Sequence, residues 1–176
     1  MSPAITSIPV PPATRISSEI PGSDFHDCYV MPLAHEGRSA LEIFLHTMAR
    51  SPHWVEAMMG LRNRVVGLFG LKNLGHLGAL PPHKEAAEYK IGNRVGIFTL
   101  LSMSDDEVIL GDNDRHLDVK VSLCKVMRDD HEAVAVTTVV HIHNLLGRVY
   151  MLFVAPMHRI IAPAVMARGA SASRHG

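Results

Sequence analysis

Two neighbouring runs, "HLDVKVSLCKV" (residues 116–126) and "EAVAVTTVVHIH" (residues 132–143), alternate apolar with polar or small side chains. This period of two is typical of β-strands, whose successive side chains point to opposite faces. The short polar segment between them predicts a hairpin. Val119 and Val121 fall on the apolar side, whereas His141 and His143 fall on the opposite side. The alternation therefore indicates an antiparallel sheet with one buried face.

The flanking sequence supplies the other elements of the domain. "DFHDCYVMPL" (24–33) is rich in strand formers, and "VGIFTLLSM" (95–103) and "EVILG" (107–111) read as further strands. "SALEIFLHTMAR" (39–50) has helical spacing of its apolar residues. A second helix restarts at Pro52 and places Trp54, Met58 and Leu61 on one face. One strand, two helices, four or more strands and a last helix predict an α+β domain.

The composition is that of a globular domain, with 47% hydrophobic and 19% charged residues. Lys plus Arg (17) balance Asp plus Glu (17), which argues against nucleic acid as a partner. Cys28 and Cys124 form no paired motif, and no secretion signal is present at the start, so we expect a cytoplasmic protein with reduced thiols. Pro and Ser content predicts a flexible tail over residues 1–22, a single domain over 23–168 and a second tail over 169–176.

The segment "LLGRVYMLFVAPMHRIIAPAVMA" (145–167) is long enough to span a bilayer. Three basic side chains and two prolines interrupt it, so we predict a buried core helix, kinked at Pro156, and no membrane span. One apolar stripe is expected to face the sheet. Its members are Leu145, Val149, Phe153, Pro156, Ile160 and Ala164.

The order of elements resembles the helix-grip fold of the START and Bet v 1-like (SRPBCC, polyketide cyclase-type) superfamily. The segments "SDDEVILGDNDRHLDVKVSL" (104–123) and "VHIHNLLGRVYMLFVAPMHRII" (140–161) resemble the bacterial family DUF2867. The resemblance implies a curved antiparallel sheet of about five or more strands around a long kinked C-terminal helix, with a cavity between them. It implies no particular activity.

Several polar residues suggest chemistry, each with a plainer alternative. His141 and His143, with His116 and Asp118 on the same face, suggest a metal site or a proton-handling pair. However, parity places them opposite the core, where cross-strand polar pairs are common. We therefore expect neither a bound metal nor a cofactor. Arg148 and Arg159 lie eleven residues apart, and they suit either an anionic head group or ion pairs with the sheet.

Three functions follow from these features. The first is binding of a hydrophobic small molecule in an internal cavity lined by Trp54, Met58, Leu61, Val119, Val121, Arg148, Val149 and Phe153. Cyclase- or isomerase-type acid–base chemistry could accompany it, with His141 or His143 as the base, so the sequence does not decide whether the protein is an enzyme. The alternatives are a non-catalytic protein-interaction module, for which a homodimer stays open, and a metal-dependent enzyme. The loop 71–85 is expected to cover the cavity.

Overall fold

The computed structural model describes residues 5–33, 37–67, 80–81 and 84–171, so most of the loop 71–85 lies outside the described residues. Its centre is a seven-stranded antiparallel sheet with the order β1-β2-β7-β6-β5-β4-β3. The α+β class is confirmed. The elements are β1 (Thr6–Ser7), η1 (Arg15–Glu19), β2 (Phe25–Pro32), α1 (Ala40–Met48), α2 (His53–Gly67), η2 (Ala86–Glu88), β3 (Arg94–Val95), β4 (Phe98–Met103), β5 (Glu107–Asn113), β6 (Leu117–Arg128), β7 (His131–Ile142) and α3 (Leu145–Ser171).

The predicted hairpin is β6 and β7, which pair along their whole length, from Leu117 opposite Ile142 to Arg128 opposite His131. The tight turn between them places Asp129 and Asp130 at positive φ, a conformation that Asp tolerates better than most residues. The sheet therefore forms where the alternation predicted it.

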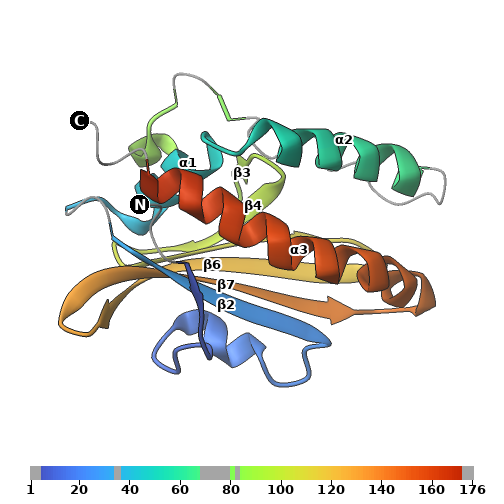
Figure 1. Ribbon diagram of the computed structural model, residues 1–176, viewed down its shortest axis with the longest axis horizontal. Helices are drawn as coiled ribbons and strands as arrows, with labels where there is room; N and C mark the ends of the chain where they lie inside the picture. Colours follow the sequence, from blue (N-terminus) through green and yellow to red (C-terminus); the bar gives the residue numbers. More distant parts are fainter. Residues whose placement is uncertain (1–4, 34–36, 68–79, 82–83, 172–176) are drawn as a thin grey trace.

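The helices lie on one face of the sheet, and Figure 1 shows α3 above the strands with α2 above α3. A capping box starts α1, because the Glu42 amide donates to Ser39 Oγ (3.3 Å) and the Ser39 amide donates to Glu42 Oε2 (2.7 Å). Phe44 of α1 is buried against the inner face of the sheet, in a cluster that includes Leu110 and Leu123. This cluster is the main core.

The opposite face of the sheet is covered by the N-terminal segment, which was predicted to be a flexible tail. Residues 5–22 instead form β1 and η1 against the sheet, and Ile16 is fully buried. The carboxylate of Glu107 accepts hydrogen bonds from the Arg15 amide (2.7 Å), the Ile16 amide (3.2 Å) and the Ser122 hydroxyl (2.7 Å). The domain thus begins well before residue 23. At the other end α3 continues to Ser171, beyond the predicted limit of residue 168.

The predicted orientation of α3 is wrong. Gly147 and Met151 are buried, whereas Leu145, Phe153 and Ile160 are exposed. The helix packs mainly on α1 and on β2, a strand near one edge of the sheet, and large side chains on its outer side stay exposed. By length and apolar composition alone, α3 is long enough to cross a membrane. Only 17% of its apolar segment is buried inside the protein, whereas a core helix would be mostly buried. The expectation of a buried core helix therefore fails.

Gly147 lies against the backbone of His116, the residue before β6. A Cβ at this position would overlap the carbonyl oxygen of His116 and reach 3.0 Å from Ile142 Cγ2. Because the obstacle is backbone, Gly147→Ala should lower the free energy of unfolding by roughly 1–3 kcal/mol, as overpacking does. Denaturant unfolding measures this change. Gly60→Ala in α2 is the control, because a Cβ there meets nothing within 4 Å, and it should be neutral or stabilising.

Candidate functional site

The most unusual feature of the surface is a row of exposed apolar side chains on α3, which we call the apolar stripe. Its members are between 44% and 74% exposed: Leu145, Val149, Leu152, Phe153 and Ile160. At 3.6 residues per turn they fall within about a third of the helix circumference, so they share one side of the helix. The stripe spans the sixteen residues from Leu145 to Ile160, or about 22 Å of helix. Large apolar side chains gathered in this way mark a binding surface more often than scattered ones do.

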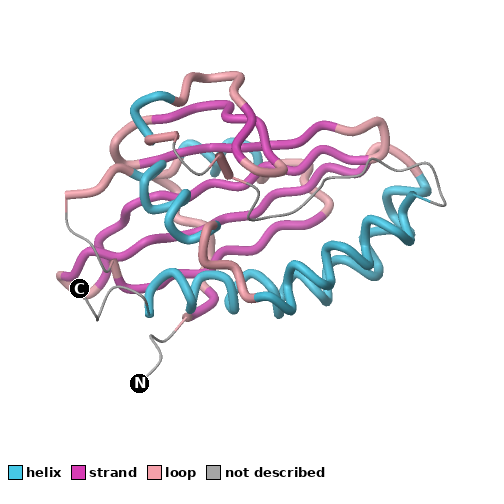
Figure 2. The backbone as a smooth tube through the Cα atoms, turned by 90° about the horizontal axis from the view of Figure 1, so that it is seen from above, coloured by secondary structure: helices cyan, strands magenta, loops and turns pink. Residues whose placement is uncertain are grey.

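The apolar stripe faces away from the sheet. Gly147, Met151 and His158 lie on the opposite side of α3, toward β2 and β6. Figures 1 and 2 place α2 over this outer side of α3. On α2, Trp54 is 44% exposed and Met58 is partly buried. The side chain of Leu61 lies outside the described residues.

One end of the apolar stripe opens into a hollow at the start of α3. This open hollow, about 310 Å³ in volume, is lined by Ile142, His143, Asn144, Leu145 and Arg148. The side chain of Asn144 caps the helix by accepting from the Gly147 amide (3.1 Å). Residues 145–171 contain Arg148, Arg159 and Arg168 but no Asp or Glu. The apolar stripe therefore has a cationic border, and the hollow at its end combines apolar and polar side chains.

The sheet residues of the predicted cavity lie elsewhere. Val119 and Val121 belong to the inner face of the sheet, where both pack in the core cluster. A small, partly open space of about 20 Å³, room for a water, lies between α1, β2 and the end of α3, lined in part by Met31 and Ile43. The structure thus separates the predicted set into two groups. Val149 and Phe153 are on the outer side of α3, whereas Val119 and Val121 are in the core on the inner face of the sheet.

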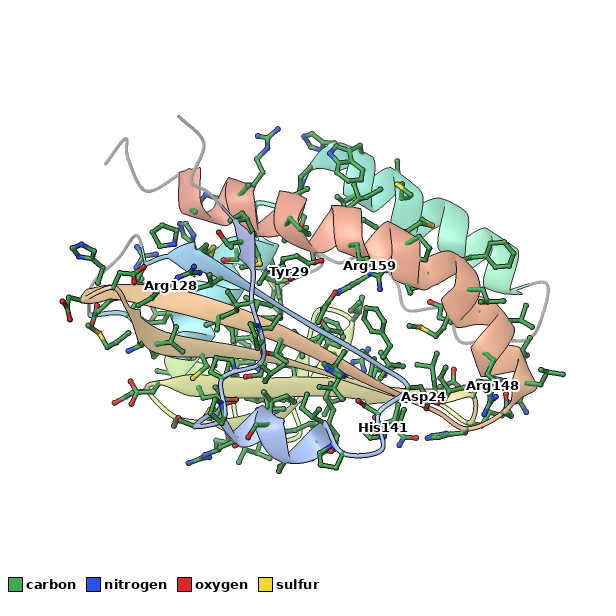
Figure 3. The ribbon with its side chains drawn as sticks, turned by 60° about the horizontal axis from the view of Figure 1, so that its bottom comes forward. Asp24, Tyr29, Arg128, His141, Arg148 and Arg159 are labelled. Atoms are coloured by element: carbon green, nitrogen blue, oxygen red, sulfur yellow. The ribbon has the colours of Figure 1, made fainter. Side chains whose placement is uncertain are left out.

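His141 lies on the sheet face predicted by parity, opposite the core, and is not exposed to open solvent because the N-terminal segment covers it. Its Nε2 is 3.0 Å from the carbonyl oxygen of Glu19, and Figure 3 shows it beside η1, away from α3. His143 lies in the hollow instead. In the described part of the chain no three His, Cys, Asp or Glu side chains are grouped so that they could hold a metal ion.

A polar cluster beneath α3 was missed by the sequence analysis. His158 Nε2 is 3.3 Å from Asp27 Oδ1, and the His158 ring meets the edge of Phe25 at a centroid distance of 5.9 Å. The guanidinium of Arg159 lies 5.9 Å from the centroid of the same Phe25 ring. Figure 3 shows Arg159 and Tyr29 in the region between α3 and β2. Alternation along β2 places Asp27 and Tyr29 on one face, but only the tertiary fold brings His158 to them.

The two cysteines are buried on the outer face and reduced. Burial, with the nearby carboxylates of Glu107 and Asp106, raises the pKa of the Cys124 thiol to about 11. Burial also raises the pKa of Cys28. Such thiols are poor nucleophiles at neutral pH, so they are unsuited to catalysis.

The raised pKa of Cys124 predicts a loss of stability at alkaline pH. The unfolded chain releases the thiol proton near the ordinary pKa of 9.0, and the folded chain only near 11. The contribution of the protonated thiol to the free energy of unfolding is therefore full below pH 9 and is lost as pH rises through 11. The loss should be roughly 2–3 kcal/mol, at 1.36 kcal/mol per pKa unit. Denaturant unfolding at pH 9 and pH 11 should show that the wild type loses more stability between the two pH values than Cys124→Val does. Equal pH dependence in the two proteins would contradict the assignment.

The fold and site define an α+β protein with a seven-stranded antiparallel sheet and a long C-terminal helix that exposes an apolar stripe. A family described as "Protein of unknown function (DUF2867)" matches residues 19–165, and the chain belongs to this family. No curated protein and no solved structure matches the chain significantly.

Proposed function

We propose that the protein binds a hydrophobic small molecule that carries an anionic head group, with its apolar part on the apolar stripe and its head at Arg148. The observation that carries this proposal is the exposed apolar stripe itself, which begins in the hollow where Arg148 and His143 lie. Burying one such side chain against a ligand contributes about 1.5–3 kcal/mol, so several together give useful affinity. Arg148 adds a charge-assisted hydrogen bond to a carboxylate or phosphate.

The charges on α3 favour this ligand over a second copy of the chain. Pairing two copies of α3 would bring together surfaces that carry arginine and no acidic residue. Like charges at an interface disfavour association. The position of α2 over the outer side of α3 also favours a narrow ligand over a flat membrane surface, which needs an unobstructed face.

The helix-grip relationship forms part of the proposal. Apart from the short β1, the chain order is β2, two α-helices, the five consecutive antiparallel strands β3–β7 and the long α3, which is the order expected of START and Bet v 1-like proteins. The ligand site proposed here differs from the expected one, because the apolar stripe is on the outer side of α3. A non-catalytic interaction module is the second candidate. The exposed apolar stripe also suits a protein partner. An acidic amphipathic helix could place its apolar face on the stripe and its carboxylates beside the arginines of α3.

Titration with a fluorescent fatty acid tests the first candidate. We expect micromolar binding and a change in the emission of Trp54, the only tryptophan of the chain. Phe153→Asp should weaken binding about 10- to 100-fold, because one buried aromatic contact is lost. Arg148→Gln should weaken binding of the fatty acid but not binding of its methyl ester. Lys90→Gln, at an exposed position outside α3 and the hollow, is the charge-matched control. Equal binding by wild type and Phe153→Asp would rule the site out.

A further inference from the structure

The polar cluster beneath α3 has the composition of an acid–base centre. Asp27 and Tyr29 project from β2, and His158 and Arg159 from α3. The Asp27 side chain is 11% exposed and that of His158 is 25% exposed, so the carboxylate is shielded while the imidazole remains reachable. The edge of the Phe25 ring meets the imidazole on the same side of α3, so one apolar group borders the pair.

The geometry fixes the orientation of the imidazole. With Asp27 accepting from Nε2–H, the lone pair of His158 lies on Nδ1, and in the described part of the chain that atom has no hydrogen-bond partner. A carboxylate behind an imidazole also stabilises the protonated ring that a base becomes. Asp27 Oδ2 is buried with no partner among the described groups, so the carboxylate is not neutralised by other donors.

Two further groups can stabilise a negative oxygen beside this base. The guanidinium of Arg159 is held against Phe25, and no described carboxylate forms an ion pair with it. Burial and the charge of Asp27 raise the pKa of Tyr29, which keeps its hydroxyl protonated and able to donate. A base, its positioning carboxylate and two donors for an oxyanion are the groups that carbon-acid chemistry requires.

We propose that His158 is the catalytic base of a proton-transfer site for small apolar carbonyl compounds, with Asp27 as its positioning residue and Arg159 and Tyr29 as oxyanion donors. His158 Nδ1 takes a proton from the carbon next to the carbonyl. The C–H electron pair forms a carbon–carbon double bond, and the carbonyl π pair moves to the oxygen, where Arg159 and Tyr29 hold it. Return of the proton to a conjugated carbon shifts the double bond, so the net reaction is an isomerisation without any oxidant. This inference is independent of fatty-acid binding at Arg148.

The test uses the full chain and a medium-chain β,γ-unsaturated ketone. Its conversion to the conjugated ketone appears as a new ultraviolet band, and exchange in deuterium oxide is followed by NMR. We expect wild-type catalysis, a fall of at least about 100-fold in kcat for His158→Ala, and partial rescue by added imidazole. Arg159→Gln should lower kcat while leaving the Asp27–His158 pair in place.

The control is His131→Gln, which removes an exposed histidine at the start of β7, outside the cluster, and should keep the wild-type rate. A wild type that neither isomerises nor exchanges the ketone overturns the inference, as does full activity in His158→Ala. Fatty-acid titration of the same samples separates the two proposals. Binding without turnover leaves the proposed function standing and rejects the acid–base centre.

Discussion

Glu107→Ala should lower the free energy of unfolding by roughly 3–5 kcal/mol, a large part of the stability of a typical domain. The carboxylate is buried on the outer face, where it binds the Arg15 and Ile16 amides and the Ser122 hydroxyl. Removing it leaves three donors without their acceptor and frees the N-terminal segment from β5 and β6. Denaturant unfolding followed by circular dichroism measures the loss.

Glu132→Ala is the control for this change. Glu132 is also an acidic residue of the sheet, but its side chain is exposed, so its removal should change stability by less than about 0.5 kcal/mol. If Glu107→Ala were equally mild, the N-terminal segment would not be part of the folded domain. The original expectation of a tail over residues 1–22 would then be right.

Met151→Asp and Leu152→Asp should give opposite results although the residues are adjacent. Met151 is 8% exposed and faces the sheet, so a carboxylate there would be buried at a cost of several kcal/mol and should leave the domain unfolded or molten. Leu152 is 73% exposed on the apolar stripe, so Leu152→Asp should melt cooperatively within about 1 kcal/mol of the wild type.

Ile160→Asp extends this comparison along the helix. A helix whose stripe faced the sheet would be unfolded by this change, but Ile160 is 66% exposed and the variant should fold normally. If Leu152→Asp or Ile160→Asp unfolded the protein while Met151→Asp did not, the orientation of α3 would be the reverse of that described here.

The sheet could be predicted because its side chains alternate, and alternation in β6 and β7 specifies both the strands and their faces. The face of α3 could not be predicted in the same way. This helix is apolar nearly all round, so periodicity gives no preferred side. Its docking side is marked by small residues instead, since a Cβ at Gly147 would meet the backbone of His116 and one at Gly169 would meet Thr47. Those two glycines were the sequence feature that could have indicated the docking side of α3.

Local sequence patterns were equally insufficient to predict the surroundings of the candidate functional residues. Parity placed His141 correctly on the face opposite the core, but it could not reveal that the N-terminal segment covers that face. Proline and serine suggested disorder there, while the buried Ile16 is one apolar residue in a polar run. The Asp27–His158 pair joins residues 131 positions apart, and no local pattern connects them.

Intermolecular NOEs between a bound fatty acid and methyl-labelled protein test the proposed site most directly. The account predicts contacts from the acyl chain to the methyl groups of Leu145, Leu152 and Ile160, with chemical-shift changes at Arg148. Contacts confined to Val119, Val121 and Leu110 would place the ligand between α3 and the sheet and would contradict the proposal. Saturating fatty acid that gives no contact to any of these methyl groups would contradict ligand binding by this domain altogether.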